Sequence, residues 1–503
     1  MAGTEEKLKR LREITAEISR LNSIQALLEW DQQVNMPRGG AEDRGNQTAL
    51  IAGLAFDKST SDELGTLIAD LASEVTDLDA DDEYAREIKV ARRNFERSAR
   101  IPREKIIEFV LATSAAHEVW VKARQDNDFK SFEPHLNHIF DLRRQQAELF
   151  QPYDHPYDAL LEEYEPGMKT ADVRAIFEAL RPRQVELLRA IAASEQVDNT
   201  FVKQYYPFDD QRKLGSFIAS RFGYDWERGR LDLAPHPFTT SFGAGDVRIT
   251  TRFLEKDGMS ALFSMMHETG HALYDQGLSP KYRETSLDRA ASYAIHESQS
   301  RLWENMVGRS REFCRFAFPV MQMLFPQHLG NITLEQFYRG INRVEPSFIR
   351  VEADEATYNM HIMLRFEIET GLLDGSLRAR DLPEIWNTRM QEYLGITPPD
   401  DTNGVLQDVH WSSGLIGYFP TYALGNLISA QLWEKMLQDY PGIPDAMTAG
   451  DFSQILAWLR QNVHSLSARY DPLDLVRRIT GGPIDPEPYL RYLNTKYRDI
   501  YRF

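Results

Sequence analysis

Cysteine is almost missing from this chain, which has a single one, Cys314, among 503 residues. One thiol cannot form an intramolecular disulfide, so the sequence excludes a disulfide scaffold and favours a reducing compartment. The bulky apolar residues around it, in residues 311–319, predict a core thiol rather than a nucleophile.

Positive charge and long apolar runs are scarce as well. The chain has 58 lysines and arginines against 76 aspartates and glutamates, which gives a net charge of -18. Nucleic acids and anionic membrane surfaces select clustered positive charge, so we predict neither as a partner. No run of 18 apolar residues can span a membrane, and residues 1–21 predict a charged helix without the apolar core of a signal peptide. We therefore expect a cytoplasmic protein.

Helical periodicity is what the sequence has in abundance. With 42% hydrophobic and 27% charged residues, the composition is typical of a large folded enzyme. In residues 4–30, one apolar stripe has spacings of three and four and consists of Leu8, Leu11, Ile14, Ile18 and Leu21. Similar patterns predict helices over residues 62–75, 85–99, 103–126, 133–151, 171–194, 209–222, 370–393, 426–440 and 451–464.

The clearest strand signal lies in residues 238–254. Val247, Ile249, Thr251 and Phe253 alternate with other residues after a Gly-Ala-Gly-Asp turn, which predicts one arm of a β-hairpin. No internal repeat, low-complexity tract or long linker interrupts the chain. We therefore predict a mainly α single unit over residues 1–503, with a small β-sheet.

The segment after this strand contains H-E-x-x-H, formed by His267, Glu268 and His271. In a helix, positions i and i+4 lie on one face, so both imidazoles can bind one metal ion. Glu268, one position on, can reach a metal-bound water and accept its proton. The motif predicts the catalytic helix of a metallopeptidase, and a chance occurrence in a chain with 12 histidines is the alternative.

Residues around the motif favour a helix. Asp257 and Ser260 can cap its start, and Gly277 with Pro280 ends it. Gly270 lies in the middle, where glycine costs about 1 kcal/mol relative to alanine. We expect this glycine to admit either another backbone or the substrate.

The third metal ligand must come from elsewhere, because the extended motif that ends in a third histidine is absent. A glutamate from a following helix is the usual solution, and Glu284, Glu297 and Glu304 are candidates. Glu284 lies only 13 residues after His271, which leaves little room for the chain to reverse. Glu304 could instead pair with Arg301 on the surface. We prefer Glu297, because its 26-residue spacing accommodates a helix end, a loop and two further turns.

Further segments match a known family in their order along the chain. They are WDQQVNMPRGGAEDR (30–44), DVRIT (246–250), HETGH (267–271), HESQS (296–300), IRVEAD (349–354) and GVLQDVHW (404–411). On these motifs the sequence resembles the carboxypeptidase Taq family of thermostable metallocarboxypeptidases.

The resemblance implies a helical fold similar to neurolysin and angiotensin-converting enzyme, with two helical halves flanking a deep cleft. The metal-binding core would span about residues 238–310. His267, His271 and Glu297 would bind one divalent metal per chain, zinc or alternatively cobalt, and Glu268 would be the general base. The resemblance also implies a homodimer that releases C-terminal amino acids from peptides with broad side-chain preference.

Two aromatic residues are candidates for stabilising the oxyanion that develops during hydrolysis. His410 and Tyr422 lie in a glycine-rich segment without an amphipathic stripe. Glycines at Gly414, Gly417 and Gly425 would let this segment bend close to the substrate. Simple packing of the two aromatic side chains is the alternative.

Substrate binding by a carboxypeptidase also needs a cation for the terminal carboxylate, and arginine can form a bidentate pair. Arg350, in an expected helix, and Arg248 are the candidates, and we also expect Asp246, beside Arg248, to bind substrate. The alternative for each arginine is a structural ion pair, of Arg350 with Glu352 or Asp354 and of Arg248 with Asp246. Residues 246–254 could act as an edge strand for the substrate backbone. His296 points about 100° away from its neighbour in a helix, so we expect it to support a ligand or face the substrate.

The leading hypothesis is therefore a metallocarboxypeptidase acting on peptides with a free C-terminus. An oligopeptidase or dipeptidyl carboxypeptidase of the same helical class is the nearest alternative. A peptide-binding scaffold without turnover is a third, and the intact Glu268 argues against it because a binder does not need that carboxylate.

Overall fold

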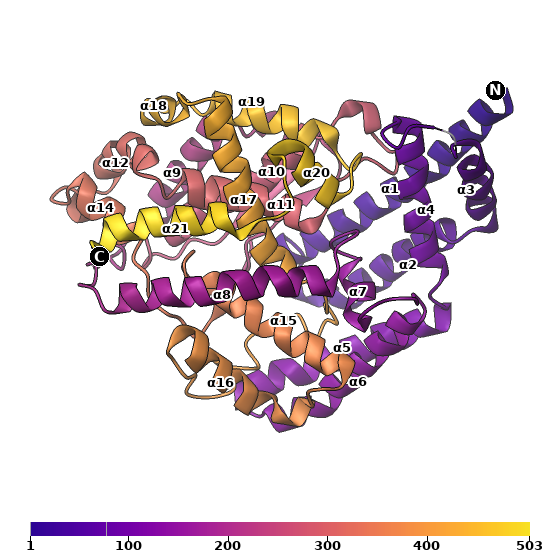
Figure 1. Cartoon of the computed structure of the whole chain (residues 1–503), viewed down its shortest axis with the longest axis horizontal. Coiled ribbons are helices and arrows are strands. Elements are labelled where there is room, and N and C mark those ends of the chain that lie inside the picture. Colours follow the sequence, from indigo (N-terminus) through magenta and orange to yellow (C-terminus); the bar gives the residue numbers. More distant parts are fainter. Residues whose placement is uncertain (1, 77) are drawn as a thin grey trace.

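The computed structural model describes residues 2–76 and 78–503, and most of this part of the chain is helical (Figure 1). The mainly α prediction is therefore confirmed. In the described residues, β-structure is confined to one small sheet that precedes the H-E-x-x-H helix.

The first helices form a layer at the right of Figure 1. They are α1 (Ala2–Val34), α2 (Ala41–Ser59), α3 (Asp62–Glu74) and α4 (Glu83–Ala99). Helices α1, α3 and α4 share a small apolar core formed by Leu11, Ile14, Leu64, Ile68, Leu71, Ile88 and Ala91. The main core is separate from it and runs from residue 116 to residue 501.

The main core is built from the remaining helices. Those before the sheet are α5 (Arg103–Asp126), α6 (Phe129–Glu148), α7 (Pro156–Leu161), α8 (Thr170–Ala192) and α9 (Phe208–Phe222). Those after it are α10 (Ser260–Gly277), α11 (Tyr293–Arg301), α12 (Arg311–Leu324), α13 (Pro326–Leu329), α14 (Leu334–Ile341), α15 (Tyr358–Asp374), α16 (Leu382–Leu394), α17 (Pro420–Asp439), α18 (Ile443–Thr448), α19 (Ser453–Asn462), α20 (Pro472–Thr480) and α21 (Pro486–Tyr501).

The sheet contains β1 (Leu231–Leu233), β2 (Thr239–Ser241) and β3 (Val247–Thr251) in the order β1-β3-β2. Strands β2 and β3 are antiparallel and confirm the predicted hairpin, whose turn includes Gly243 at a φ of 127°. Glycine populates this backbone region readily because it has no Cβ. Strand β1 pairs with the other side of β3 in parallel. The prediction that residues 246–254 supply an edge strand is therefore wrong, because β3 is central and β2 lies at the edge.

The H-E-x-x-H helix, α10, begins and ends where the sequence indicated. The Asp257 carboxylate accepts hydrogen bonds from the main-chain N–H groups of Met259 and Ser260, and the helix ends at Gly277. Helix α11 continues into a π-helical segment, η4 (Leu302–Val307). Such segments are often found at functional sites.

Two expected helices differ in the structure. Residues 370–393 were expected to form one helix, but α15 ends before Gly375, whose φ of 80° is left-handed, and α16 begins at Leu382. Arg350 was expected in a helix, but it lies in the single turn η5 (Arg350–Glu352), and α15 begins only at Tyr358. Hydrophobic periodicity alone did not reveal either break.

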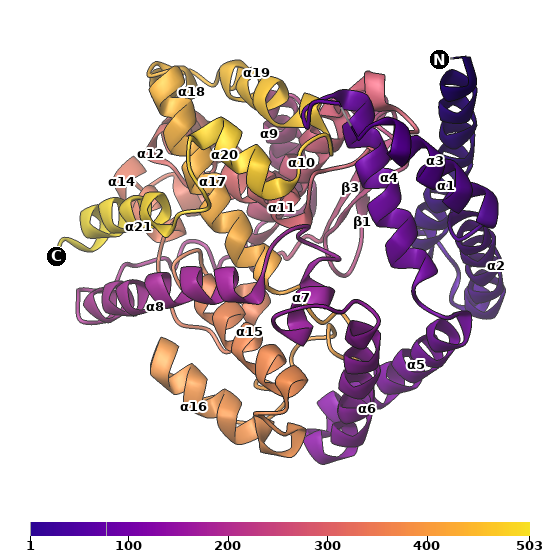
Figure 2. The ribbon, with the colours of Figure 1, turned by 45° about the vertical axis from the view of Figure 1, so that its right-hand side comes forward.

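The two views of the ribbon agree on how the helices group (Figures 1 and 2). Helices α5 to α8, α15 and α16 lie in the lower part, while α9 to α12 and α17 to α20 lie in the upper part. The division into two halves that flank a cleft stays a prediction. None of the described helices is both long and apolar enough to cross a membrane.

Candidate metal centre

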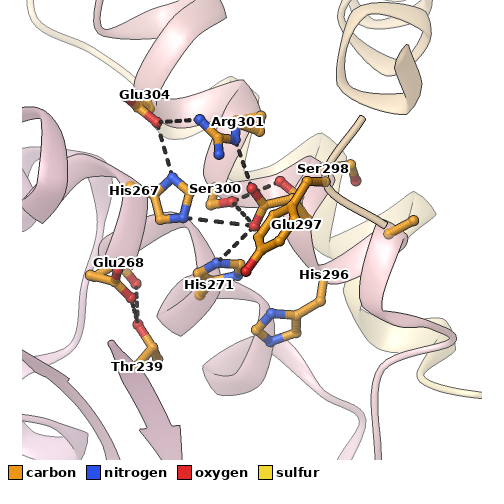
Figure 3. Close-up of polar contacts among 12 residues, drawn as sticks. Thr239, His267, Glu268, His271, His296, Glu297, Ser298, Ser300, Arg301 and Glu304 are labelled. Carbon is orange, nitrogen blue, oxygen red and sulfur yellow. Dashed lines mark hydrogen bonds and ion pairs between the residues drawn. The ribbon is translucent and has the colours of Figure 1, made fainter. Parts of the chain in front are cut away.

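Helices α10 and α11 bring His267, His271 and Glu297 together (Figure 3). One ligand atom from each residue lies within 4.8 Å of the other two. The Glu297 Oε2 atom is 3.7 Å from Nε2 of His267 and 3.3 Å from Nε2 of His271. The two imidazoles lie one helical turn apart, as the i, i+4 spacing required.

The chemistry of this donor set fits a transition metal. Two imidazole nitrogens and one carboxylate oxygen are typical of a catalytic zinc site, which keeps a further position open. The side chains of His267 and His271 retain 19% and 15% of their exposure, so solvent or substrate can reach them. Burial and the neighbouring His296 lower the pKa of His271 to about 4, so its imidazole is neutral and can donate a lone pair.

Glu304 and Arg301 orient two of these residues. The Oε2 atom of Glu304 lies 3.0 Å from Nδ1 of His267, on the ring nitrogen opposite the shared site. The Nε atom of Arg301 donates to Oε1 of Glu297 at 2.7 Å, and its Nη1 atom donates to Oε2 of Glu304 at 3.4 Å. The expectation that Glu304 pairs with Arg301 on the surface is therefore only half correct. The pair exists, but Glu304 lies inside the site, because η4 packs against α10 and the Glu304 carboxylate reaches Nδ1 of His267.

Glu284, the remaining candidate for the third ligand, is not part of this group. Both Nε and Nη2 of Arg20, on α1, donate to the Glu284 carboxylate at 2.9 and 2.7 Å. This pair joins the N-terminal layer to the loop between α10 and α11.

His296 lies beside a candidate ligand. Its ring stacks on His271 with centroids 4.5 Å apart and an interplanar angle of 17°. Its Nε2 atom lies 3.0 Å from the Asp275 carboxylate. Burial opposes its positive charge, but Asp275 and Glu297 raise the pKa of His296 above its ordinary value. His296 was expected either to support a ligand or to face the substrate. Its contact with His271 agrees with the first of these roles.

Glu268 is buried on α10, and its carboxylate faces β2. The Thr239 hydroxyl donates a hydrogen bond to Oε2 of Glu268 at 2.7 Å. Burial raises the pKa of Glu268, because removal from water disfavours the charged form. A raised pKa brings a carboxylate closer to the range in which it can both take up and release a proton.

Two glycines allow neighbouring helices to approach α11 closely. A Cβ at Gly270 would lie 2.6 Å from the Cα of Ser300, and one at Gly425, in α17, would lie 2.6 Å from Cγ of Glu297. Gly270 therefore admits another backbone, which was one of the two expected reasons for a glycine at this position. Gly425 was expected to bend a loop, but it lies within α17 and makes room for the Glu297 side chain. Gly414 and Gly417 do lie in turns, with φ values of 69° and 96°.

His410 and Tyr422 lie together near the site. Nε2 of His410 is 3.4 Å from the Tyr422 hydroxyl, and Tyr422 is in the first turn of α17. Burial, together with the nearby charge of Arg350, lowers the pKa of His410 to about 3. Burial raises the pKa of Tyr422, so the phenol keeps its proton. Both side chains are therefore neutral at pH 7 and can act as hydrogen-bond donors.

Arg350 is buried in an ion pair that the sequence did not indicate. Its Nε and Nη2 atoms donate to Oδ1 of Asp408 at 3.1 and 2.9 Å, and its Nη1 atom donates to the Tyr358 hydroxyl at 2.8 Å. Asp408 also accepts a hydrogen bond from Nε of Arg365 at 2.6 Å. The expected alternative, an ion pair of Arg350 with Glu352 or Asp354, is therefore wrong, because Arg350 pairs with Asp408.

Arg248 makes the ion pair that was expected for it as an alternative. Its Nε and Nη2 atoms donate to the two carboxylate oxygens of Asp246, both at 2.8 Å. The guanidinium lies between the rings of Trp30 and Phe242, 4.3 and 4.9 Å from their centroids. Arg248 and Asp246 thus close the β2–β3 hairpin.

Some residues of the site were missed from the sequence. Thr239, Asp408 and Arg365 were not singled out, although Asp408 lies within the GVLQDVHW motif. The run of two threonines in β2 carried no chemical signal, because only the pairing of β2 beside α10 gives Thr239 its contact.

Comparisons with known proteins agree with this geometry. A family model described as carboxypeptidase Taq (M32) metallopeptidase matches residues 10–497. Thermostable carboxypeptidase 1 of Thermus thermophilus is 39% identical over 503 aligned residues, and Carboxypeptidase 1 of Bacillus subtilis is 37% identical over 494, with 98% of each chain covered in both cases. The crystal structure of an M32 carboxypeptidase from Deinococcus radiodurans has a TM-score of 0.96 at 40% identity and covers 99% of this chain and 100% of that one. The protein is therefore a peptide hydrolase that belongs to the carboxypeptidase Taq family of metallopeptidases.

Proposed function

We propose that this metallopeptidase releases single amino acids from the free C-termini of peptides, with broad preference for the terminal side chain. The observation that carries the proposal is a buried excess of positive charge beside His410 and Tyr422. Arg350 and Arg365 share one carboxylate, that of Asp408, so one positive charge remains without a partner in this group.

A buried charge is costly unless an opposite charge pairs with it. Burial, followed by the charges of Arg365 and Arg350, lowers the pKa of His361 far below its ordinary value. This histidine is therefore neutral. Of the five N–H groups of Arg350, three make the hydrogen bonds described above, which leaves two free among the described residues. The terminal carboxylate of a peptide would supply the missing negative charge. Because every peptide with a free C-terminus has this carboxylate, whatever its last side chain, an anchor that binds it fits broad side-chain preference.

His267, His271 and Glu297 would hold one divalent metal, for which the two-nitrogen, one-oxygen donor set favours zinc, with cobalt as the alternative. When bound, the metal supplies Lewis acidity that polarises the peptide carbonyl and lowers the pKa of the attacking water. Glu304 would fix the ring orientation of His267 through the opposite nitrogen, as carboxylates beside metal-bound histidines do.

The protein's own groups would move the protons. Glu268 accepts a proton from the attacking water and then passes it to the nitrogen of the leaving amino acid. Tyr422 and His410 donate hydrogen bonds to the oxyanion that develops on the former carbonyl oxygen. Arg350 holds the terminal carboxylate, which places the last peptide bond of the chain at Glu268.

A single assay tests this function. The metal-loaded protein is given an N-terminally blocked peptide with a free C-terminus and the same peptide ending in an amide, and the released products are identified. We expect rapid release of single amino acids from the free-acid peptide and only slow cleavage of the amide peptide. Released dipeptides would indicate a dipeptidyl carboxypeptidase, equal cleavage of both peptides an oligopeptidase, and no release a binding scaffold.

The metal ligands are tested by Glu297→Ala. Loss of one of three protein ligands weakens the site directly, so we expect bound zinc and activity to fall together. The matched control is Glu284→Ala, which removes only a solvent-exposed pair with Arg20 and should leave one metal ion per chain. Metal analysis after extensive dialysis measures both variants. One tightly bound zinc in the Glu297→Ala protein would require a different ligand.

We also propose a homodimer. Large apolar side chains are exposed on α1, α2 and α5, and they include Ile24, Leu27, Leu50, Leu54, Ile107, Val110 and Leu111. Exposed apolar surface of this kind is typical of protein–protein contacts. A second copy of the chain would cover it, and the mass of the protein in solution tests this.

A further inference from the structure

We propose that Thr239 is a positioning residue for the general base, and that the DVRIT segment holds Thr239 in place. This inference rests on the proposed role of Glu268 and extends it to β2. The carrying observation is the hydrogen bond of 2.7 Å from the Thr239 hydroxyl to Oε2 of Glu268 (Figure 3). Among the residues that the structure describes, no other side chain hydrogen-bonds to this carboxylate.

The contact fixes which oxygen of Glu268 remains free. A carboxylate accepts hydrogen bonds on both oxygens, and Thr239 occupies Oε2. The Oε1 atom is thereby left for the attacking water. Without the hydroxyl, the terminal torsion of a glutamate is broad, and the carboxylate can rotate away from the productive orientation.

The Thr239 hydroxyl also has a second acceptor within reach. The main-chain oxygen of Glu268 lies 2.9 Å from the hydroxyl oxygen. A hydroxyl has one proton, so it donates to one of these acceptors at a time, and the charged carboxylate is the stronger. Once Glu268 has accepted the proton of water, the hydroxyl can turn to the main-chain oxygen. The same side chain therefore accommodates the base before and after proton transfer.

Residues of the DVRIT segment hold the start of β2. The Thr250 hydroxyl accepts a hydrogen bond from the N–H of Phe238 at 2.9 Å and donates one to the Phe238 oxygen at 3.0 Å. The Thr250 N–H donates to the same oxygen at 2.9 Å. Thr250 is fully buried, and Phe238 directly precedes Thr239.

The other end of the same segment closes the hairpin. Asp246 pairs with Arg248 through two hydrogen bonds, and its main-chain oxygen accepts one from the N–H of Phe242 at 2.9 Å. Strand β2 is thus fixed at both ends by DVRIT residues. The segment was expected to bind substrate through Arg248 and Asp246, and we assign it instead to aligning β2 with the base.

The chain offers a matched control for this assignment. Thr240 follows Thr239 on the same strand, and successive strand residues point to opposite faces. Both threonines can be changed to valine, which keeps the shape and removes the hydroxyl. Thr239→Ser restores a hydroxyl at the same position.

We expect Thr239→Val to lower kcat by about 10- to 100-fold, with KM within about two-fold of wild type, since a misplaced catalytic group costs this much. Metal content should stay at one ion per chain. Thr240→Val should leave kcat within about two-fold, and Thr239→Ser should recover most of the activity. Equal losses in the two valine variants, no recovery with serine, or a loss confined to KM would each overturn the proposal.

A double variant separates this proposal from the role of Glu268. If Thr239 acts through the base, adding Thr239→Val to Glu268→Gln should not lower the remaining activity further. A full additional loss would show that Thr239 acts by another route. Full activity of Glu268→Gln itself would instead remove the proposed function of that residue, whatever the outcome at Thr239.

Discussion

Glu268→Gln is expected to reduce kcat by about 10²- to 10⁴-fold, which is the usual cost of removing a positioned base. Glutamine has nearly the same shape as glutamate and can still accept the Thr239 hydrogen bond through its amide oxygen. It cannot take a proton from water at neutral pH. The measurement is the rate of amino-acid release at saturating peptide, with metal content determined on the same sample.

The fold and the metal content of the Glu268→Gln variant should equal those of the wild type. Glu268 does not belong to the group formed by His267, His271 and Glu297, so the metal content should remain at one ion per chain. Peptide binding should also persist, because the proposed anchor, Arg350, is on another element. A kcat within a few-fold of wild type would exclude Glu268 as the base, and a variant without metal would make the comparison meaningless as a test of proton transfer.

The grouping of His267, His271 and Glu297 could be predicted from the local sequence, because helical geometry fixes the spacing of the two histidines. His267 and His271 share a face whenever their segment is helical, and the structure has a helix over Ser260–Gly277. Glu297 followed from the length of chain needed to turn back. The prediction that Gly270 admits another backbone is confirmed by its close approach to Ser300. It could be made because a glycine in mid-helix is costly without such a reason.

The partners of these residues could not be predicted, because tertiary packing brings them together. Asp408 is 58 residues from Arg350 and 43 from Arg365 in the chain. Glu304 contacts His267 only through the packing of η4, which continues α11, against α10. Thr239 acquires its contact with Glu268 through strand pairing. In each case, the missing information was the position of a second element.

Substitution of Arg350, the proposed anchor of the terminal carboxylate, should have the second large effect. Arg350→Ala should lower kcat/KM on peptides with a free C-terminus by about 30- to 5,000-fold, which corresponds to roughly 2–5 kcal/mol for a carboxylate left unpaired in a buried site. The same change should have little effect on the slow cleavage of a peptide amide, which has no carboxylate to lose. The ratio of kcat/KM for the two substrates is the quantity to measure.

The charge count explains why this variant should fold. Removing Arg350 leaves Asp408 paired with Arg365, so the buried group becomes neutral instead of losing its only counterion. The thermal midpoint should therefore change little, and metal content should not change. Arg350→Lys should recover only part of the activity, since an ammonium lacks the planar fork of a guanidinium.

Arg248→Ala is the control that distinguishes anchoring from support. Arg248 is already paired with Asp246, and its loss would loosen the hairpin behind Thr239. It should therefore slow cleavage of the free-acid and amide peptides by the same factor, whereas Arg350→Ala should change their ratio. If the two variants exchanged behaviour, the terminal carboxylate would be bound by Arg248, and the buried positive charge around Asp408 would have to be balanced by another anion.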